Sequence, residues 1–246
     1  MKKIEFLTLL FVLMFFVFNL SVGALNTGFS TESLPEDAQK QILSKLSLEL
    51  IPQNTFDDSI NCFDVREDGM IAIGCLGDDT HVIKIYNRDM VFQYGYTFKC
   101  HGIFGLEWDG DFLMIYFVRS DIIASFDPNG ACVEMARIEN TTENNSYWNH
   151  TVFSTKRETE NGSYILQNDM GFLNFFEMTY SQLKHIDNEG NESILYDVNS
   201  NQLAKYVMTL IVVLILVIIA VFILVSVWRK IKNAGDGSQY SYPSNR

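Results

Sequence analysis

Apolar and polar positions alternate in short runs through the middle of the chain, from about residue 60 to residue 198. Turn residues separate these runs every 8–12 positions, a pattern that predicts β-strands rather than helices. Asp68-Gly69 and Asp109-Gly110 lie between such runs, and Gly accepts the positive φ that a tight hairpin needs. We therefore predict antiparallel strands over 62–65, 70–74, 82–86, 91–98, 104–108, 112–118, 122–126 and 132–138.

The strand pattern recurs with a period near 40 residues. The segment 83–87 aligns with 123–127 at an offset of 40, and a third copy at 183–187 follows after another 60 positions. The longer second interval indicates an insertion of about 20 residues before the third copy. We place this insertion in the segment 139–162, which is rich in Asn, Thr, Glu and Ser.

Units of about 40 residues with four strands each are typical of propeller blades. The units FDVREDGMIAIGCLGDDTHVIKIYNRDMVFQYGYTF and FGLEWDGDFLMIYFVRSDIIASFDPNGACVEMARI resemble bacterial β-propeller blades of the tryptophan–aspartate or NHL kind. The segment YSQLKHIDNEGNESILYDV is similar to the second half of another blade, so the resemblance covers 60–198. The chain as a whole also resembles single-pass surface proteins of Gram-positive bacteria.

The resemblance implies an all-β ectodomain of about three four-stranded antiparallel blades, with a binding or scaffolding role and no known activity. Propellers usually close with at least about four blades, and fewer blades leave unpaired strand edges. Three arrangements therefore stay open: an open stack of sheets, a compact three-sheet domain, and part of a ring that a second chain completes.

The chain begins with the pattern of a secretory signal over 1–24. Two lysines precede an almost purely apolar run, and Val22-Gly23-Ala24 has the small residues that signal peptidase needs. The segment 25–59 then forms a lead-in to the repeats at 60–204. Within the lead-in, a capping-box spacing at Ser33 and Glu36 predicts a short helix over 34–46, and an alternating run up to Ile51 predicts a first strand.

A second apolar run, 207–228, has 22 residues without charge, Pro or Gly, and this length is enough to span a bilayer as a helix. The tail 229–246 has four Lys or Arg residues against Asp236 alone. The positive-inside rule therefore places this tail in the cytoplasm, and the signal peptide exports the N-terminal side. We predict a single-pass plasma-membrane protein with its N-terminus outside the cell.

The exported segment 25–204 is strongly acidic, with 11 Lys and Arg against 28 Asp and Glu and a net charge of −17. Nucleic-acid binding needs a basic face and is excluded as a function class by this balance. We find no P-loop, dinucleotide fingerprint, nucleophile elbow or metal-ligand spacing, so the sequence predicts no cofactor, no metal site and no enzyme activity.

Loops on one face of the predicted blades bring together charged and aromatic residues that are candidates for ligand binding. In a blade, the loop between the second and third strands shares a face with the loop to the next blade. Such a rim also includes Trp148 if the insertion folds over it. The candidate binding residues are Asp79, His81, His101, Arg119, Asp121 and Trp148. Ordinary solvated loops are the alternative interpretation.

Four cysteines in an exported domain allow disulfide bonds. Cys62 and Cys75 are placed symmetrically about the Asp68-Gly69 turn. A two-residue loop would put them directly opposite each other, whereas a four-residue loop would leave them diagonal. Buried free thiols are the alternative. Asn-x-Ser/Thr sequons begin at Asn140, Asn144, Asn149, Asn161 and Asn191.

The sequence therefore favours a membrane-anchored extracellular module that binds a protein or small-molecule partner. A second hypothesis is a structural assembly protein whose open sheet edges pair in a homo-oligomer. A third is an exported propeller hydrolase with its site at His81, His101 and Arg119.

Overall fold

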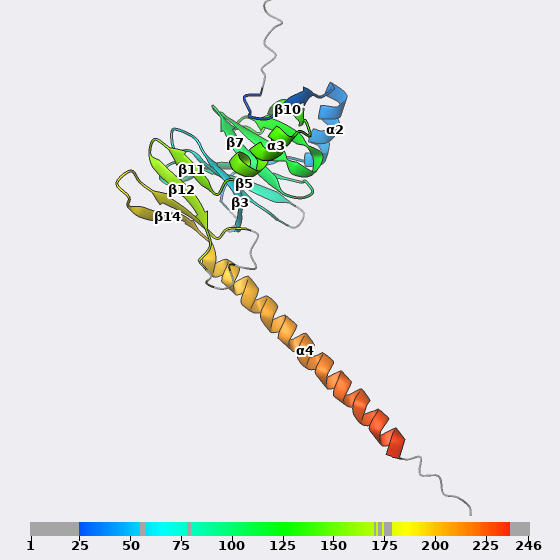
Figure 1. The fold of residues 1–246 in the computed structure, drawn as a ribbon. Coiled ribbons are helices and arrows are strands. Elements are labelled where there is room, and N and C mark those ends of the chain that lie inside the picture. Colours follow the sequence, from blue (N-terminus) through cyan, green and yellow to red (C-terminus); the bar gives the residue numbers. More distant parts are fainter. Residues whose placement is uncertain are drawn as a thin grey trace, which may run out of the picture. The chain divides into compact units, whose positions relative to one another are not determined.

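The computed structural model describes residues 25–54, 58–77, 80–169, 171, 174 and 179–236. The chain is mostly β, with three antiparallel sheets and one long apolar C-terminal helix (Figure 1). It divides into two compact units, Met1–Val198 and Asn199–Arg246. The predicted signal 1–24 lies outside the described residues, as does the tail from residue 237 onward.

Each sheet is built from four strands that follow one another along the chain. The first sheet has β3 (Ile60–Val65), β4 (Ile71–Cys75), β5 (His81–Tyr86) and β6 (Phe92–Phe98). The second has β7 (Phe104–Asp109), β8 (Phe112–Phe117), β9 (Ile122–Phe126) and β10 (Cys132–Ile138). The third has β11 (Lys156–Thr159), β12 (Gly162–Gln167), β13 (Gln182–Ile186) and β14 (Glu192–Asp197).

The same turn joins the last two strands of every sheet, which shows the sequence repeat in three dimensions. Asn87, Asp127 and Asp187 each begin this turn, and each side-chain Oδ1 accepts two backbone N–H groups of its own turn. The turn needs a positive φ three residues later, which Gly130 and Gly190 supply at 80° and 86°. The offsets of 40 and 60 residues between these turns match the sequence period.

The first sheet lies between the other two, so its central strands are buried on both faces. Ile83 and Ile85 of β5 face the second sheet in one hydrophobic cluster. Ile71 and Ile73 of β4 pack against the third sheet in another. Every residue of β4 and β5 is buried, which explains why these strands read as continuous apolar runs.

The N-terminal segment covers the outer edges of the first two sheets. β1 (Thr31–Ser33) pairs with β10, and β2 (Glu49–Ile51) pairs with β6. Helix α2 (Glu36–Leu46) connects these two short strands and packs Leu46 into the cluster between the sheets. The predicted helix over 34–46 and the predicted first strand are confirmed. Both sheets thereby gain a fifth strand at an edge.

A short helical segment covers the remaining face of the second sheet. It consists of α3 (Thr142–Tyr147) and the π-helical turn η2 (Trp148–Val152). Trp148 and Val152 pack there with Tyr116 and Phe29 in a third cluster. β11 and the beginning of β12 follow directly and fall inside the segment 139–162 that was predicted as an insertion, so only its first part is one.

The first strands of the three sheets converge. β3 contacts both β7 and β11, and the third sheet packs on the first sheet. The α3–η2 segment covers the face of the second sheet where a closed ring would need the third. Within the described residues the sheets therefore form no closed propeller.

The second unit is helix α4 (Asn199–Asp236). Residues Asn199–Ile231 of this helix form a 33-residue candidate membrane span, whose most apolar 18-residue window has a mean hydropathy of 3.7 and no buried residues. The predicted span 207–228 lies inside this helix. It is the one helix in the described part of the chain that is long and apolar enough to cross a bilayer.

Candidate functional site: a cationic cleft

A cleft of about 850 Å³ opens between helix α2 and the ends of strands from the first two sheets. Its wall on one side is the C-terminal half of α2. The opposite wall comes from the loop after β6, the 3₁₀ turn η1 (Val118–Ser120) and the strands β8, β9 and β10. The cleft is lined by Ile42, Lys45, Leu46, Lys99, Cys100, His101, Phe117, Arg119, Ser120, Ile122 and Arg137.

The lining separates into an apolar part and a cationic part. Leu46, Phe117 and Ile122 are buried members of the cluster between the two sheets, and Ile42 of α2 packs against that cluster. The cationic side chains are exposed and come from four elements: Lys45 from α2, Lys99 from the loop after β6, Arg119 from η1 and Arg137 from β10. The cleft therefore has an apolar interior beneath a cationic rim.

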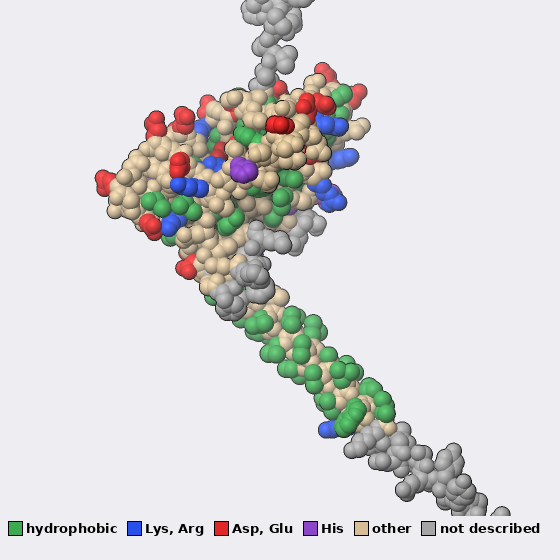
Figure 2. All heavy atoms as spheres, in the orientation of Figure 1, with side chains coloured by type: hydrophobic (Ala, Val, Ile, Leu, Met, Phe, Trp, Pro, Cys, Tyr) green, Lys and Arg blue, Asp and Glu red, His purple; other side chains and the backbone are tan. Residues whose placement is uncertain are grey.

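This concentration of positive charge contrasts with the acidic domain around it. Lys and Arg side chains gather on the side of the molecule where Figure 1 draws α2, whereas acidic side chains are spread over the top and left of the same view (Figure 2). Among the described residues, Lys45, Lys99, Arg119 and Arg137 form no ion pair. Their charges are thus available to an anionic ligand. Ion pairs do engage Lys40, Arg66, Lys156, Arg157 and Lys184.

Two of the residues predicted for the binding rim, His101 and Arg119, line this cleft. Asp121 is exposed next to it and ends η1 in a left-handed conformation with a φ of 52°. Asp79 lies outside the described residues. Trp148 is not on this rim, because η2 folds against the second sheet and packs the indole against Phe29 and Tyr116.

His81 is buried and supports the cleft from behind instead of lining it. Its Nδ1 accepts the backbone N–H of Gly77 at 3.3 Å, so its Nε2 carries the proton and donates to the carbonyl of Cys100 at 3.1 Å. Burial lowers the pKa of this imidazole, because the charged form loses its water. His81 is therefore a neutral tether for the strand end that carries Lys99, Cys100 and His101.

Cys100 places a half-buried thiol in the wall of the cleft. Burial raises the pKa of this thiol to about 11, so it is protonated at neutral pH and is a weak nucleophile. Cys132, in β10 outside the cleft lining, has a similar partial burial and a thiol pKa that burial also raises to about 11. The two thiols therefore differ mainly in position, because Cys100 lines the cleft and Cys132 does not.

Cys62 and Cys75 are both buried in the first sheet. Val65 pairs with Ile71, and Arg66 and Met70 continue the ladder, so the hairpin turn is centred on Asp68. Cys62 then lies opposite Gly74, and a bulge places Cys75 opposite Ile60. The two cysteines are diagonal neighbours, not direct partners. The disulfide between them stays a prediction that this register does not favour.

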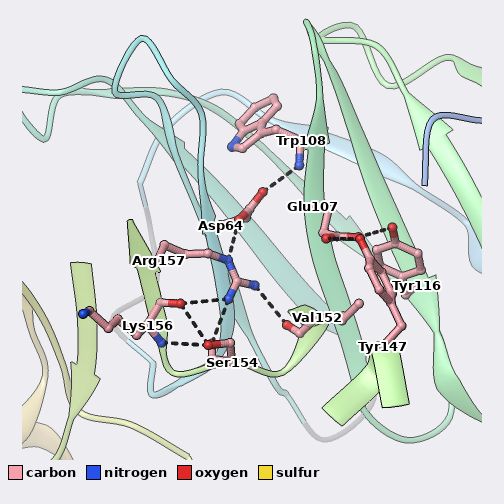
Figure 3. Close-up of polar contacts among 9 residues, drawn as sticks. All are labelled: Asp64, Glu107, Trp108, Tyr116, Tyr147, Val152, Ser154, Lys156 and Arg157. Atoms are coloured by element: carbon pink, nitrogen blue, oxygen red, sulfur yellow. Dashed lines mark hydrogen bonds and ion pairs between the residues drawn. The ribbon is translucent and has the colours of Figure 1, made fainter. Parts of the chain in front are cut away.

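A second polar cluster lies where the first strands of the three sheets meet (Figure 3). Arg157 Nε of β11 donates to Asp64 Oδ1 of β3 at 2.6 Å, and Asp64 Oδ2 accepts the backbone N–H of Trp108 in β7 at 2.7 Å. The other guanidinium nitrogens of Arg157 donate to the carbonyls of Ser154 and Val152, each at 3.1 Å. The hydrogen-bonding groups of Arg157 and Asp64 are used by contacts within the protein. We therefore interpret this cluster as a structural joint between the sheets and not as a ligand site.

Glu107 of β7 forms a separate buried pair of hydrogen bonds beside this joint. The hydroxyl of Tyr147 donates to Glu107 Oε1 at 2.8 Å, and the hydroxyl of Tyr116 donates to Oε2. Burial raises the pKa of the Glu107 carboxyl, although both hydroxyls act in the opposite direction. These bonds fix α3 against the second sheet.

The cleft offers a ligand cationic side chains at its rim and apolar side chains inside it. In the described ranges, no group of three or more His, Cys, Asp or Glu side chains could hold a metal ion. Sequence reasoning missed Lys45, Lys99 and Arg137, because they belong to a helix, a strand end and an edge-side strand that only the fold brings together. The one signal in the sequence was that Lys and Arg are scarce in a segment with 28 acidic residues, so a group of them in one place is notable.

No protein-family model, no curated protein and no solved structure matches this chain.

Proposed function

We propose that the chain is a single-pass, membrane-anchored module that binds an anionic ligand in the cationic cleft outside the cell. In this proposal α4 crosses the plasma membrane, its basic C-terminal end from Arg229 onward stays in the cytoplasm, and the three sheets form a propeller-like stack. The repeated turn and the converging first strands support the kinship with propeller blades. The four cationic side chains around an apolar cleft carry the binding proposal.

The geometry gives binding more support than the two other hypotheses. Both ring nitrogens of His81 are engaged with backbone groups, so the residue is poorly placed to act as a base in a hydrolase. Homo-oligomer assembly through open edges has less support for the first two sheets, because β1 and β2 cover one edge of each.

The test uses the full chain in nanodiscs of zwitterionic lipid and follows thermal unfolding with organic carboxylates, phosphates and sulfonates. A ligand that binds only the folded state raises the melting temperature, and the rise grows with the ratio of the ligand concentration to its dissociation constant. We expect some anions to raise it and matched organic cations to leave it unchanged.

Two variants locate the binding site. Combined Lys99→Gln and Arg119→Gln changes should remove the anion-dependent rise, whereas Arg88→Gln should preserve it, because Arg88 is exposed in the turn between β5 and β6. A rise that is identical in all three proteins, or absent with every anion, would contradict the proposal.

A further inference from the structure

We propose that the ligand of the cationic cleft is an amphiphilic acid, a small molecule with one acidic head group and an apolar body. This inference rests on the proposed function and adds the chemical class of the ligand. It commits to a small molecule and not to an acidic protein surface.

The apolar part of the lining is the first argument. Leu46, Phe117 and Ile122 are buried members of the hydrophobic cluster between the sheets, and Ile42, which is partly buried, packs against them and adds apolar surface to the cleft. A compact inorganic anion would leave this surface in contact with water. A hydrocarbon body would bury it, and burial of apolar surface is the main favourable contribution to binding in such pockets.

The size of the cleft is the second argument. Its volume of about 850 Å³ falls in the range of roughly 300–1,000 Å³ that small-molecule sites occupy. A bare phosphate or acetate would fill only a small part of it. An acid with a chain of roughly eight carbons would use both the apolar interior and the rim.

The composition of the rim is the third argument. Arg119 and Arg137 have planar guanidinium groups, which bind carboxylate and phosphate oxygens through paired hydrogen bonds. Lys45 and Lys99 add point charges on the helix and on the loop after β6. Because all four are exposed, the acidic head group belongs at the mouth of the cleft and the apolar body inside it.

Cys100 provides a built-in reporter of occupancy. Its thiol is in the cleft wall, whereas the thiol of Cys132 has a similar partial burial outside the lining. A ligand in the cleft blocks access to Cys100 alone. Alkylation of the full chain in zwitterionic nanodiscs by N-ethylmaleimide, read by mass spectrometry at both cysteines, therefore measures binding with an internal control.

The experiment compares octanoate and octyl phosphate with octanol, which lacks the acid, and with acetate and inorganic phosphate, which lack the body. We expect at least one octyl acid to slow alkylation of Cys100 by roughly fivefold or more, with saturation, and to leave Cys132 unchanged. The two acids show whether the head is a carboxylate or a phosphate. Octanol and the small anions should protect Cys100 much less.

Two variants connect the protection to the two halves of the lining. Arg119→Gln should weaken protection by the octyl acids and leave the effect of octanol unchanged. Ile42→Ser should weaken protection by both, and Arg88→Gln should change neither. Thermal unfolding with the same compounds supplies a second readout that does not depend on thiol reactivity.

The outcomes separate the two proposals. If inorganic phosphate or acetate protected Cys100 as well as the octyl acids, the cleft would be an anion site. This result would overturn the proposal of an amphiphilic ligand. Equal protection by octanol would show an apolar pocket without acid recognition and would overturn both proposals. The absence of protection and of thermal stabilisation with every compound would also overturn both.

Discussion

Asp64 and Arg157 are 93 residues apart in the chain, and Arg157 Nε donates to Asp64 Oδ1 at 2.6 Å. The pair connects the first strand of the first sheet with the first strand of the third, and Asp64 also binds the backbone of the second sheet at Trp108. Both side chains are almost buried, with 13% and 12% of their surface exposed for Arg157 and Asp64 respectively. One carboxylate thus joins all three sheets.

Removal of Arg157 should destabilise the fold strongly. Arg157→Ala leaves the carboxylate of Asp64 buried without its cation, which typically costs about 3–5 kcal/mol. Lys156→Ala on the same strand is the matched control, because the Lys156–Glu158 pair is exposed to solvent and should contribute little to stability. Urea unfolding of the full chain in nanodiscs measures both. If Arg157→Ala lowered the free energy of unfolding no more than Lys156→Ala does, the role of Arg157 in joining the sheets would be refuted.

Glu107 should make the fold more stable toward acid pH. Its folded-state pKa is raised above the usual value, so between those two values the folded chain binds more protons than the unfolded chain. The stability that Glu107 contributes is therefore complete below its unfolded pKa and is lost as the pH rises through the folded one.

The measurement is the free energy of unfolding of the wild type relative to Glu107→Gln between pH 4 and pH 8. We expect the wild type to lose stability relative to the variant as the pH rises. A difference that is independent of pH would show that the carboxyl titrates normally.

His81 should have the opposite effect. Burial lowers its folded-state pKa, so the unfolded chain binds more protons once the pH falls below about 6.5. The stability that neutral His81 contributes is present above that pH and is lost as the pH falls. His81→Gln should remove this component. Protonation places a hydrogen on Nδ1, so this atom can no longer accept the N–H of Gly77, whereas Nε2 still donates to the carbonyl of Cys100. The measurement is the free energy of unfolding of the wild type and of His81→Gln over the same pH range. Equal pH profiles for both proteins would contradict this role.

Asn144 should be essential for stability although it lies in a polar segment with four sequons. Its side chain accepts the N–H of Ser30 at 2.9 Å and donates to the carbonyls of Ser30 and Glu139. Asn144→Ala removes these three part-buried hydrogen bonds, two of which join α3 to Ser30 just before β1, and should cost about 1–3 kcal/mol. Asn149→Ala, at an exposed sequon of the same segment, should change stability by less than about 0.5 kcal/mol. The melting temperatures of the two variants test this prediction. Similar values for Asn144→Ala and Asn149→Ala would contradict a structural role for the Asn144 side chain.

The strands of the first two sheets could be predicted because each is an apolar run bounded by a turn signal. β11 could not, since Lys-Arg-Glu-Thr has no apolar alternation, and its position is set by the pairing of Arg157 with Asp64. The polar segment before β11 contains α3 and η2, which could not be predicted for a similar reason. Of its three buried residues, Asn144 is polar, and the two apolar ones, Trp148 and Val152, are too few to show a hydrophobic period.

The candidate site could be predicted only in part. His101 and Arg119 follow strand ends that the repeat places on one face, so blade geometry brings them together. His81 is also next to a loop, but it is the first residue of β5, whose residues are all buried because the first sheet is covered on both faces. Lys45 lies on α2, and Arg137 lies on β10, beside β1. No local pattern indicates that α2 and its flanking strands span both sheets.

The most direct test of the account is the dissociation constant of octyl phosphate for the full chain, measured by titration calorimetry in zwitterionic nanodiscs with empty nanodiscs as the blank. The account predicts saturable binding that the combined Lys99→Gln and Arg119→Gln changes weaken by roughly tenfold or more, because each removes a charge-assisted contact. Arg88→Gln should leave the constant within about twofold of the wild-type value, a difference under about 0.5 kcal/mol. Equal constants for all three proteins, or heat no different from that of empty nanodiscs, would contradict the cationic cleft as the ligand site.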